Sequence, residues 1–259
     1  MTVQVATDMK AGRLDWLGRL ALLALVLNGF AILTVNFWIY TARWDFIVRN
    51  PDYHKPPTIS RAISDPAIGA PFSVWVTLSG IFLVVGVGIL GLHFMRVVRL
   101  IEQPSRYQRL AGSVLIPAVF VLQGVSAVGM HLLSTYRFPE SRDMHMIGSY
   151  TFFVAQALLV VLFTFYNHAL LRDRAGLARL ASLGVLSARW VRARFYTGLV
   201  SIGLVVLYFA LFKAKDMYEY PEAPLLYLAY VTTEPMVISS FLLVLGLCHV
   251  DLHRVRRRG

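Results

Sequence analysis

Apolar residues in this chain fall into six long runs separated by short polar segments. A helix crosses the roughly 30 Å hydrocarbon core of a bilayer in about 20 residues, and each run is long enough to do so. No run shows the strict alternation expected of a barrel strand. The pattern therefore predicts an all-α bundle of six transmembrane helices, one domain over residues 1–259, with spans near Trp16–Thr41, Pro71–Met95, Leu110–Leu133, Met146–Leu171, Phe195–Phe212 and Leu225–Val250.

Composition supports a membrane protein. Hydrophobic residues make up 57% of the chain and charged residues only 15%, too few charges to cover the surface of a soluble domain. The net charge of +11 does not indicate nucleic acid, because the arginines lie in short segments between apolar runs. Cys248 is the only cysteine, which excludes an intrachain disulfide and a cysteine-based metal site. We expect membrane lipids as partners, no nucleic acid and no metal or cofactor.

Basic residues are concentrated between the second and third runs, between the fourth and fifth runs, and at both ends of the chain. The positive-inside rule then places both termini in the cytoplasm and makes residues 42–70 the longest outside segment. Apolar Ile59, Ile63 and Ile68 recur there, so we expect the segment to fold back onto the bundle or to dip into the interface. Pro56, Pro57 and Pro66 within it, and Pro71 directly after it, are expected to break any long helix there.

Glu234 is the most informative single residue, because it lies about ten residues into the last apolar run and is followed by Pro235. An ionisable side chain in lipid is costly and is a functional candidate by default. A buried carboxylate needs a hydrogen-bond partner or a proton. Two interpretations stay open: a structural glutamate that hydrogen-bonds between helices, or an acid that lines a polar cavity.

His145 opens the fourth run, five residues after Glu140. One interpretation joins these two with His131 and Glu234 in a polar cluster at the outer leaflet. Imidazole and carboxylate together can transfer protons, and a hydroxyl of the 42–70 loop, that of Ser60 or of Ser64, can act as nucleophile. The other makes His145 an interfacial side chain solvated by headgroups. The chain has no G-x-S-x-G elbow and no H-E-x-x-H sequence, so known hydrolase motifs do not choose between the two.

Histidines near both membrane faces allow a third interpretation, a b-type cytochrome with two haems. Haem needs axial ligands on opposite sides of one ring. The fifth run has no histidine, and no set of four falls at matching depths, so this alternative is the weakest. The histidines concerned are His54, His93, His131, His145, His168 and His249.

Four short segments follow one another in a recognisable order and spacing. They are P-T-I-S-R-A-I from Pro57 to Ile63, E-S-R-D-M-H from Glu140 to His145, A-Y-V-T-T-E ending at Glu234, and H-V-D-L containing Asp251. Together they resemble the Frag/DRAM/Sfk family of six-span membrane proteins. That family includes the Golgi factor for GPI-anchor lipid remodelling and the damage-regulated autophagy modulators. The resemblance covers nearly the full chain.

The resemblance implies a role on membrane lipids. If the fold is catalytic, it implies acyl transfer or hydrolysis at the outer leaflet, with His145 as general base and Ser60 as nucleophile. Glu140 or Glu234 would then orient His145. Further residues that we expect to line the site or contact lipid are His131, Asp65 and Asp251.

Two departures from the family pattern bear on the source and the substrate. Pro235 follows the last-span glutamate where the family often has an aromatic residue, and the outside loops lack the cysteines of mammalian members. These features suggest a bacterial inner-membrane relative and argue against GPI itself as substrate. Two functions remain: a lipid-remodelling enzyme whose site side chains converge in one cavity, or a non-catalytic lipid-binding regulator that acts through a membrane-protein partner.

Overall fold

The computed structural model describes the backbone of residues 2–99, 105–182, 186–218, 220 and 222–255, and the side chains of residues 19–96, 105–182, 186–218, 220 and 222–250. Within these ranges all regular structure is helical. The elements are α1 (Thr2–Arg49), α2 (Ile59–Ala62), α3 (Pro66–Arg99), α4 (Arg106–Leu110), the π-helical turn η1 (Ala111–Leu115), α5 (Ile116–Thr135), α6 (Arg142–Arg172), α7 (Arg174–Ser182), α8 (Ala188–Ala214) and α9 (Pro224–Val255).

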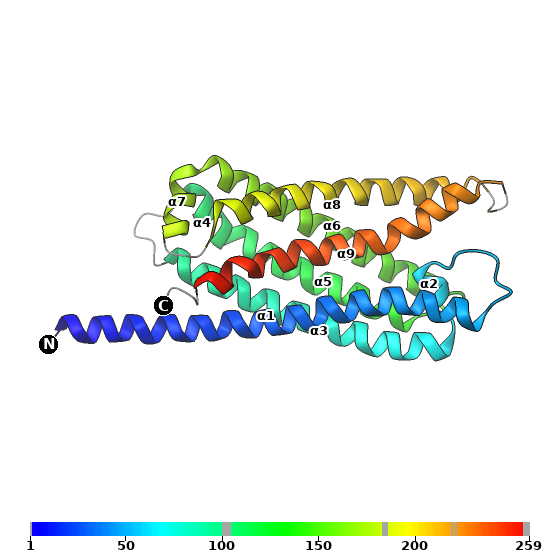
Figure 1. The fold of residues 1–259 in the computed structure, drawn as a ribbon, viewed down its shortest axis with the longest axis horizontal. Helices are drawn as coiled ribbons and strands as arrows, with labels where there is room; N and C mark the ends of the chain where they lie inside the picture. Colours follow the sequence, from blue (N-terminus) through cyan, green and yellow to red (C-terminus); the bar gives the residue numbers. More distant parts are fainter. Residues whose placement is uncertain (1, 100–104, 183–185, 219, 221, 256–259) are drawn as a thin grey trace.

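Six helical segments are long and apolar enough to cross a bilayer, which confirms the predicted six-span all-α architecture. They pack as a closed ring in which α1 contacts α3, α3 contacts α5, α5 contacts α6, α6 contacts α8, α8 contacts α9, and α9 returns to α1. The short helix α2 lies at the end of the bundle opposite the two termini (Figure 1). The spans are Arg19–Arg49, Pro66–Arg96, Arg106–Thr135, Arg142–Arg172, Ala188–Ala214 and Pro224–Val250.

Several helices extend beyond the sequence-based boundaries, as α8 does by beginning at Ala188 rather than near Phe195, and two of these ends shape the first loop. α1 continues to Arg49 rather than ending near Thr41. The buried residues Val35, Ile39, Ala42 and Phe46 recur at helical spacing, so the face of α1 that packs on the bundle extends beyond Thr41. α3 begins at Pro66, where the missing N–H would have had no intrahelical acceptor. Pro71 was expected to break a helix, but it lies inside α3, close to its start.

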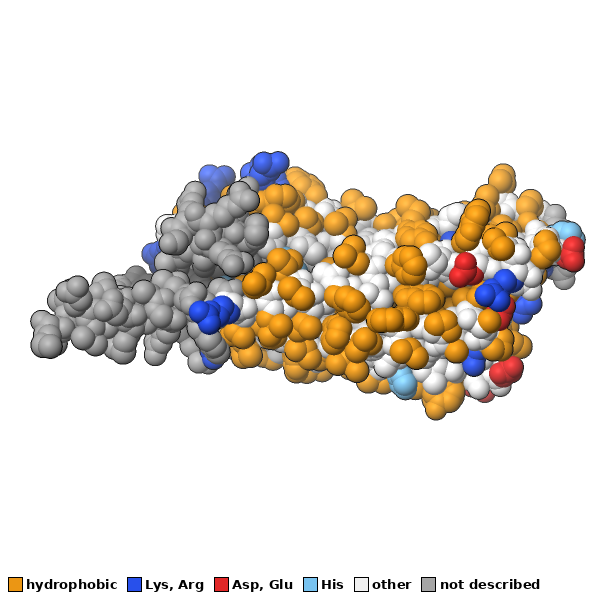
Figure 2. Space-filling view, turned by 60° about the horizontal axis from the view of Figure 1, so that its bottom comes forward, with side chains coloured by type: hydrophobic (Ala, Val, Ile, Leu, Met, Phe, Trp, Pro, Cys, Tyr) orange, Lys and Arg blue, Asp and Glu red, His pale blue; other side chains and the backbone are white. Residues whose placement is uncertain are grey.

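The exterior of the ring is apolar along its middle and charged at both ends (Figure 2). Large hydrophobic side chains such as Leu33, Val74, Phe165 and Val206 are 64–73% exposed. On a soluble monomer, so much exposed apolar surface would mark an interaction site; on this bundle it is the surface that faces the acyl chains. The protein is therefore an integral membrane protein.

Helices α5 and α6 approach closely at two glycines. A Cβ atom on Gly129 would lie 2.5 Å from the Phe152 nitrogen, and one on Gly148 would lie 2.5 Å from the Leu133 nitrogen. Only glycine permits this backbone contact, which is a common way of packing membrane helices. The crossing brings the start of α6, including His145, beside the C-terminal turn of α5.

Candidate functional site

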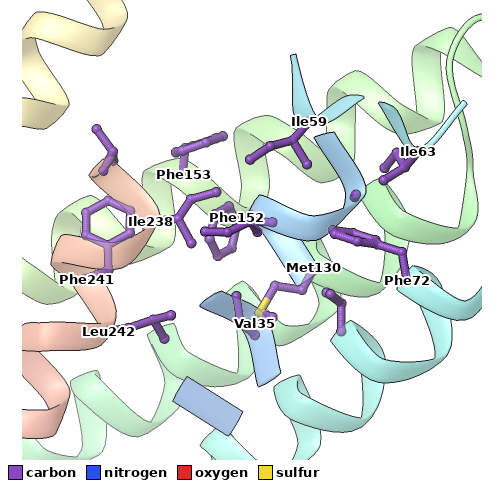
Figure 3. Close-up of a cluster of buried hydrophobic side chains, with 14 of the residues drawn as sticks. Val35, Ile59, Ile63, Phe72, Met130, Phe152, Phe153, Ile238, Phe241 and Leu242 are labelled. Atoms are coloured by element: carbon purple, nitrogen blue, oxygen red, sulfur yellow. The ribbon is translucent and has the colours of Figure 1, made fainter. Parts of the chain in front are cut away.

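The segment between α1 and α3 folds back onto the bundle through α2. The Thr58 hydroxyl caps this helix by accepting a hydrogen bond from the Arg61 N–H at 3.0 Å. Ile59 is 5% exposed, and Ala62 and Ile63 are fully buried. In Figure 3, the two isoleucines point into a cluster that includes Phe152 and Met130. The regular isoleucine spacing thus anchors the loop, as the sequence indicated.

Two charged side chains from the spans hold the start of α2. The Glu234 carboxylate, on α9, accepts a hydrogen bond from the Ile59 N–H at 2.9 Å. The Arg43 Nε, on α1, donates to the Pro57 carbonyl at 2.9 Å. Glu234 is only 5% exposed, and a charge-assisted bond to a backbone N–H is stronger than a neutral one. The last span therefore positions the loop residue that precedes Ser60.

Ser60 and His145 form a hydrogen-bonded pair in which the direction of the bond can be assigned. The His145 Nδ1 lies 3.0 Å from the Tyr136 carbonyl oxygen, and its Nε2 lies 2.8 Å from the Ser60 Oγ. A carbonyl oxygen only accepts, so Nδ1 carries the hydrogen. In the neutral imidazole, Nε2 is then an acceptor, and the Ser60 O–H donates to it. This is the arrangement in which an imidazole can take the proton of a hydroxyl nucleophile.

The group that orients His145 is a backbone carbonyl, not the carboxylate that we expected. Tyr136 follows the last residue of α5, where carbonyl groups have no intrahelical donor, and the His145 N–H satisfies one of them. Glu140 is exposed and, among the described residues, makes no hydrogen bond to His145. Glu234 bonds the loop backbone instead. The structure therefore brings the Ser60 hydroxyl, but not the Glu140 carboxylate, to His145.

A small cavity of about 40 Å³ lies beside the pair, lined by Ser60, Glu234, Ser149, Met130 and Phe152 among others. A buried water needs about 10–15 Å³ of such volume, so the cavity has room for a few waters but not for an acyl chain. Ser60 and Glu234 therefore line the same small pocket, although Glu234 lies in the last span and Ser60 in the first loop.

The remaining candidate residues lie away from this cavity. The exposed His131 has its Nδ1 3.1 Å from the Thr77 hydroxyl. Asp65 accepts from the Ala67 N–H at 2.9 Å and so caps α3. The side chain of Asp251 lies outside the described residues. Within the described ranges, no group of three or more His, Cys, Asp or Glu residues is placed to hold a metal ion.

Sequence reasoning missed three contributors to the site. Arg43 falls in the segment 42–70 that was predicted as a loop, and the continuation of α1 to Arg49 places it against the loop backbone. Ser149 lines the cavity one helical turn after His145, and that spacing on α6 was a signal available in the sequence. The Tyr136 carbonyl left no signal, because a backbone acceptor is independent of residue type.

A family model described as the Frag1/DRAM/Sfk1/Cwh43P N-terminal domain matches residues 16–255. No curated protein and no solved structure matches the chain. The matched region spans all six transmembrane segments, α2 and the cavity beside Ser60. By this match, and as the four sequence segments predicted, the chain belongs to the Frag1/DRAM/Sfk1 family of membrane proteins.

Proposed function

We propose that this protein acts on membrane lipids and transfers or hydrolyses an acyl chain, with Ser60 as nucleophile and His145 as general base. The observation that carries the proposal is the 2.8 Å hydrogen bond between Ser60 Oγ and His145 Nε2, in a chain where Nδ1 is held by the Tyr136 carbonyl. Both residues are held in place by packing: His145 is 2% exposed, and α2 is anchored through Ile59. Preorganisation of this kind lowers the cost of reaching the reactive geometry.

The chemistry follows from the direction of the hydrogen bond. As the Ser60 Oγ attacks the carbonyl carbon of an ester-linked acyl chain, its proton passes to His145 Nε2. His145 then gives that proton to the leaving alcohol oxygen of the lipid, and the acyl group stays on Ser60. A water or an acceptor hydroxyl attacks the acyl-serine, loses its proton to His145, and releases Ser60. The Ser60 N–H, in the first turn of α2, has no intrahelical acceptor and can donate to the developing oxyanion.

Substrate entry requires α2 to move. The cavity beside Ser60 has a volume of about 40 Å³, and the buried side chains of Ile59 and Ile63 cover it from the loop side. An acyl chain fits into this pocket beside Ser60 only if these side chains move apart. The bond that the Glu234 carboxylate accepts from the Ile59 N–H and the bond that Arg43 donates to the Pro57 carbonyl would then hold the site closed until a lipid displaces the loop.

A second candidate function is a non-catalytic lipid-binding regulator. The observation that favours it is that Glu234 is bonded to the loop backbone rather than to the imidazole. In this alternative, the Ser60–His145 bond serves only to dock the loop, and the loop conformation signals to a membrane-protein partner. Both candidates predict that lipids bind, but only the first predicts turnover.

Turnover by purified protein distinguishes the two. The wild type, Ser60→Ala, His145→Ala and Ser64→Ala would be reconstituted into vesicles of phosphatidylethanolamine and phosphatidylglycerol, and fatty acid and lysolipid would be followed by mass spectrometry. Ser64 is the matched control, because its hydroxyl donates to the Arg61 carbonyl in the same segment. We expect release by wild type and Ser64→Ala, and a fall of about 10²–10⁴-fold in the other two variants. Equal rates in all four would contradict the proposal.

The membrane and the orientation are part of the proposal. We infer a bacterial cytoplasmic membrane from the arginine-rich, cysteine-poor composition. The positive-inside rule places the end with α2 on the outer side, so the lipid would come from the outer leaflet.

A further inference from the structure

A second, larger cavity lies inside the helix ring, toward the end that carries the termini. Its volume is about 170 Å³, and its walls come from α3, η1, α5, α6, α8 and α9. The lining is largely aliphatic and aromatic, as in Leu83, Leu159 and Phe241. A closed ring of six helices has a central space that side chains must fill, and at this end they do not fill it.

The cavity is long and narrow. On α6 its lining runs from Gln156 to Leu170, a rise of roughly 20 Å at 1.5 Å per residue. On α3 it runs from Leu83 to Phe94, a rise of roughly 16 Å. A compact apolar cavity of roughly 150 Å³ holds a benzene ring. A similar volume drawn out over this length is too narrow for a ring, and it admits an extended alkyl chain once the lining side chains move apart.

Polar groups gather at the end of the cavity nearest the termini. Tyr166, Asn167 and Arg194 line it there, and Arg194 Nε donates to the Asn167 Oδ1 at 3.2 Å. The Tyr166 hydroxyl is buried without a hydrogen-bond partner among the described residues. A hydroxyl left in this state is costly unless a ligand or water pairs with it. The same end of the bundle carries the exposed side chains of Arg172, Arg174, Arg189 and Arg192, which favour an acidic partner.

The inner end of the cavity lies near the middle of the bundle. Gln123, 2% exposed, accepts there from Gln156 and has an amide nitrogen without a partner among the described residues. Beyond it, Phe241 lines this cavity, Phe152 lines the small cavity beside Ser60, and the two rings lie 6.4 Å apart. This aromatic pair separates the two spaces, so the larger cavity is distinct from the proposed catalytic site.

One wall of the cavity is an irregular stretch of helix. The π-helical turn Ala111–Leu115 replaces regular α-helix at the start of the third span, and both of its end residues line the cavity. Opposite, Gly91 also lines it, and a Cβ atom there would lie 2.7 Å from the Ile116 side chain. Single π-turns occur often at binding sites, because they widen a helix where a ligand must fit.

We propose that this cavity binds one alkyl chain of an acidic amphiphile. The acidic head lies at the Tyr166–Arg194 end, and the methyl end reaches Gln123. The head is a carboxylate or a phosphate, from a free fatty acid or an anionic phospholipid of the leaflet on the terminus side. The proposal stands apart from the proposed acyl chemistry and uses none of its residues.

Cys248 provides a direct probe, because it is the only cysteine of the chain and lines the cavity. In detergent solution, the rate of alkylation of Cys248 by N-ethylmaleimide would be measured with and without palmitic acid, and with and without palmitoyl-lysophosphatidylglycerol. We expect at least one of the two to slow alkylation by about tenfold or more, equivalent to roughly 1.4 kcal/mol. Protection by palmitate alone identifies the carboxylate as the head, and protection by the lysophospholipid identifies a phosphate. No protection by either overturns the proposal.

A matched pair of variants tests whether the ligand lies inside the cavity or on the outer surface of the bundle. Val119 lines the cavity, whereas Val121, two residues away on α5, is 61% exposed to the lipid side. Val119→Trp should abolish the protection, and Val121→Trp should keep it. Equal protection in both would mean that the chain binds on the outer surface, and would overturn the assignment. If Val119→Trp does not give a monodisperse protein, the smaller pair Val119→Phe and Val121→Phe makes the same comparison.

Two further variants test the orientation and the independence of the cavity. Gln123→Leu should leave palmitate protection unchanged or stronger, because it replaces an amide by an apolar group at the methyl end. A tenfold loss of protection would place the polar head at Gln123 and contradict the orientation. Ser60→Ala should not change the protection, so this proposal and the proposed function can fail separately.

Discussion

Removal of the Glu234 carboxylate tests how the last span holds the loop that carries Ser60. In Glu234→Ala, the Ile59 N–H loses its acceptor in a buried setting, since Ile59 is 5% exposed. Loss of a hydrogen bond to a charged group, with the donor left unpaired, costs about 2–3 kcal/mol. If this cost falls on the closed loop, the equilibrium for loop opening shifts by roughly 30- to 150-fold toward the open state.

Hydrogen–deuterium exchange of α2 measures that shift. The Ala62 N–H bonds the Thr58 carbonyl, and the Ile63 N–H bonds the Ile59 carbonyl, both at 3.0 Å. These amides exchange only when the loop opens, so their rates in the alanine variant should rise by the same factor. Glu234→Gln is the matched control, because its amide oxygen still accepts from Ile59. The loss of charge alone should cost about 1 kcal/mol, or roughly fivefold in rate.

Either of two results would contradict a role of Glu234 in holding the loop. If the amides of α2 exchange at wild-type rates in Glu234→Ala, the carboxylate does not hold the loop. If the glutamine and alanine variants are equally fast, the acceptor oxygen is not what matters. Amides in the middle of α5 should be unchanged in both variants, which shows that the bundle stays folded.

Three further predictions address the loop, the bundle and the topology. Arg43→Met removes the hydrogen bond from the Arg43 side chain to the loop backbone. The loss of about 1 kcal/mol should speed hydrogen–deuterium exchange of the α2 amides by roughly fivefold. An unchanged rate would show that this bond does not stabilise the closed loop. Gly148→Val should lower the unfolding temperature, because it forces α5 and α6 apart at a cost of about 1–3 kcal/mol. Gly124→Ala should not lower it, since the Cβ position of Gly124 is surrounded by open space. Equal thermal stability of the two variants would contradict the close approach of α5 and α6. Met217→Cys in a Cys248→Ser background should react with a membrane-impermeant thiol reagent added outside intact cells. Residue 217 is 75% exposed and lies in a loop that the positive-inside rule places on the outer side. Reaction only after cell lysis would show that this loop lies in the cytoplasm.

The six spans were predictable because apolar length is set by the bilayer and is local in sequence. The closed order of the ring was not, because lipid-facing and core-facing apolar residues have the same composition. The late end of α1 was visible only in the spacing of Val35, Ile39, Ala42 and Phe46. Pro71 was misjudged because a proline near the start of a helix disturbs few backbone hydrogen bonds.

Part of the candidate site was predictable from the sequence and part was not. The resemblance to a family suggested Ser60 and His145, but nothing local joins a loop to a helix start 85 residues later. Glu140 or Glu234 was expected to orient His145, because a carboxylate often accepts a hydrogen bond from a catalytic imidazole. The structure assigns that place to the Tyr136 carbonyl and gives Glu234 a backbone N–H, and no side-chain pattern can predict a backbone partner. The larger cavity lined by Tyr166 was not predictable from the sequence either, because its lining residues are of the same types as those of a filled hydrophobic core.

Covalent labelling tests directly whether Ser60 is a nucleophile activated by His145. The protein in phospholipid vesicles would be treated with an alkyl fluorophosphonate, which forms a bond from the serine Oγ to phosphorus and releases fluoride while His145 takes the proton. Peptide mass spectrometry would then locate the adduct. A nucleophilic Ser60 predicts an adduct on that residue, absent from Ser60→Ala and formed at least about a hundredfold more slowly in His145→Ala. Labelling at the same rate in His145→Ala, or no adduct on Ser60 in the wild type, would contradict a catalytic serine–histidine pair and leave the loop as a docking element.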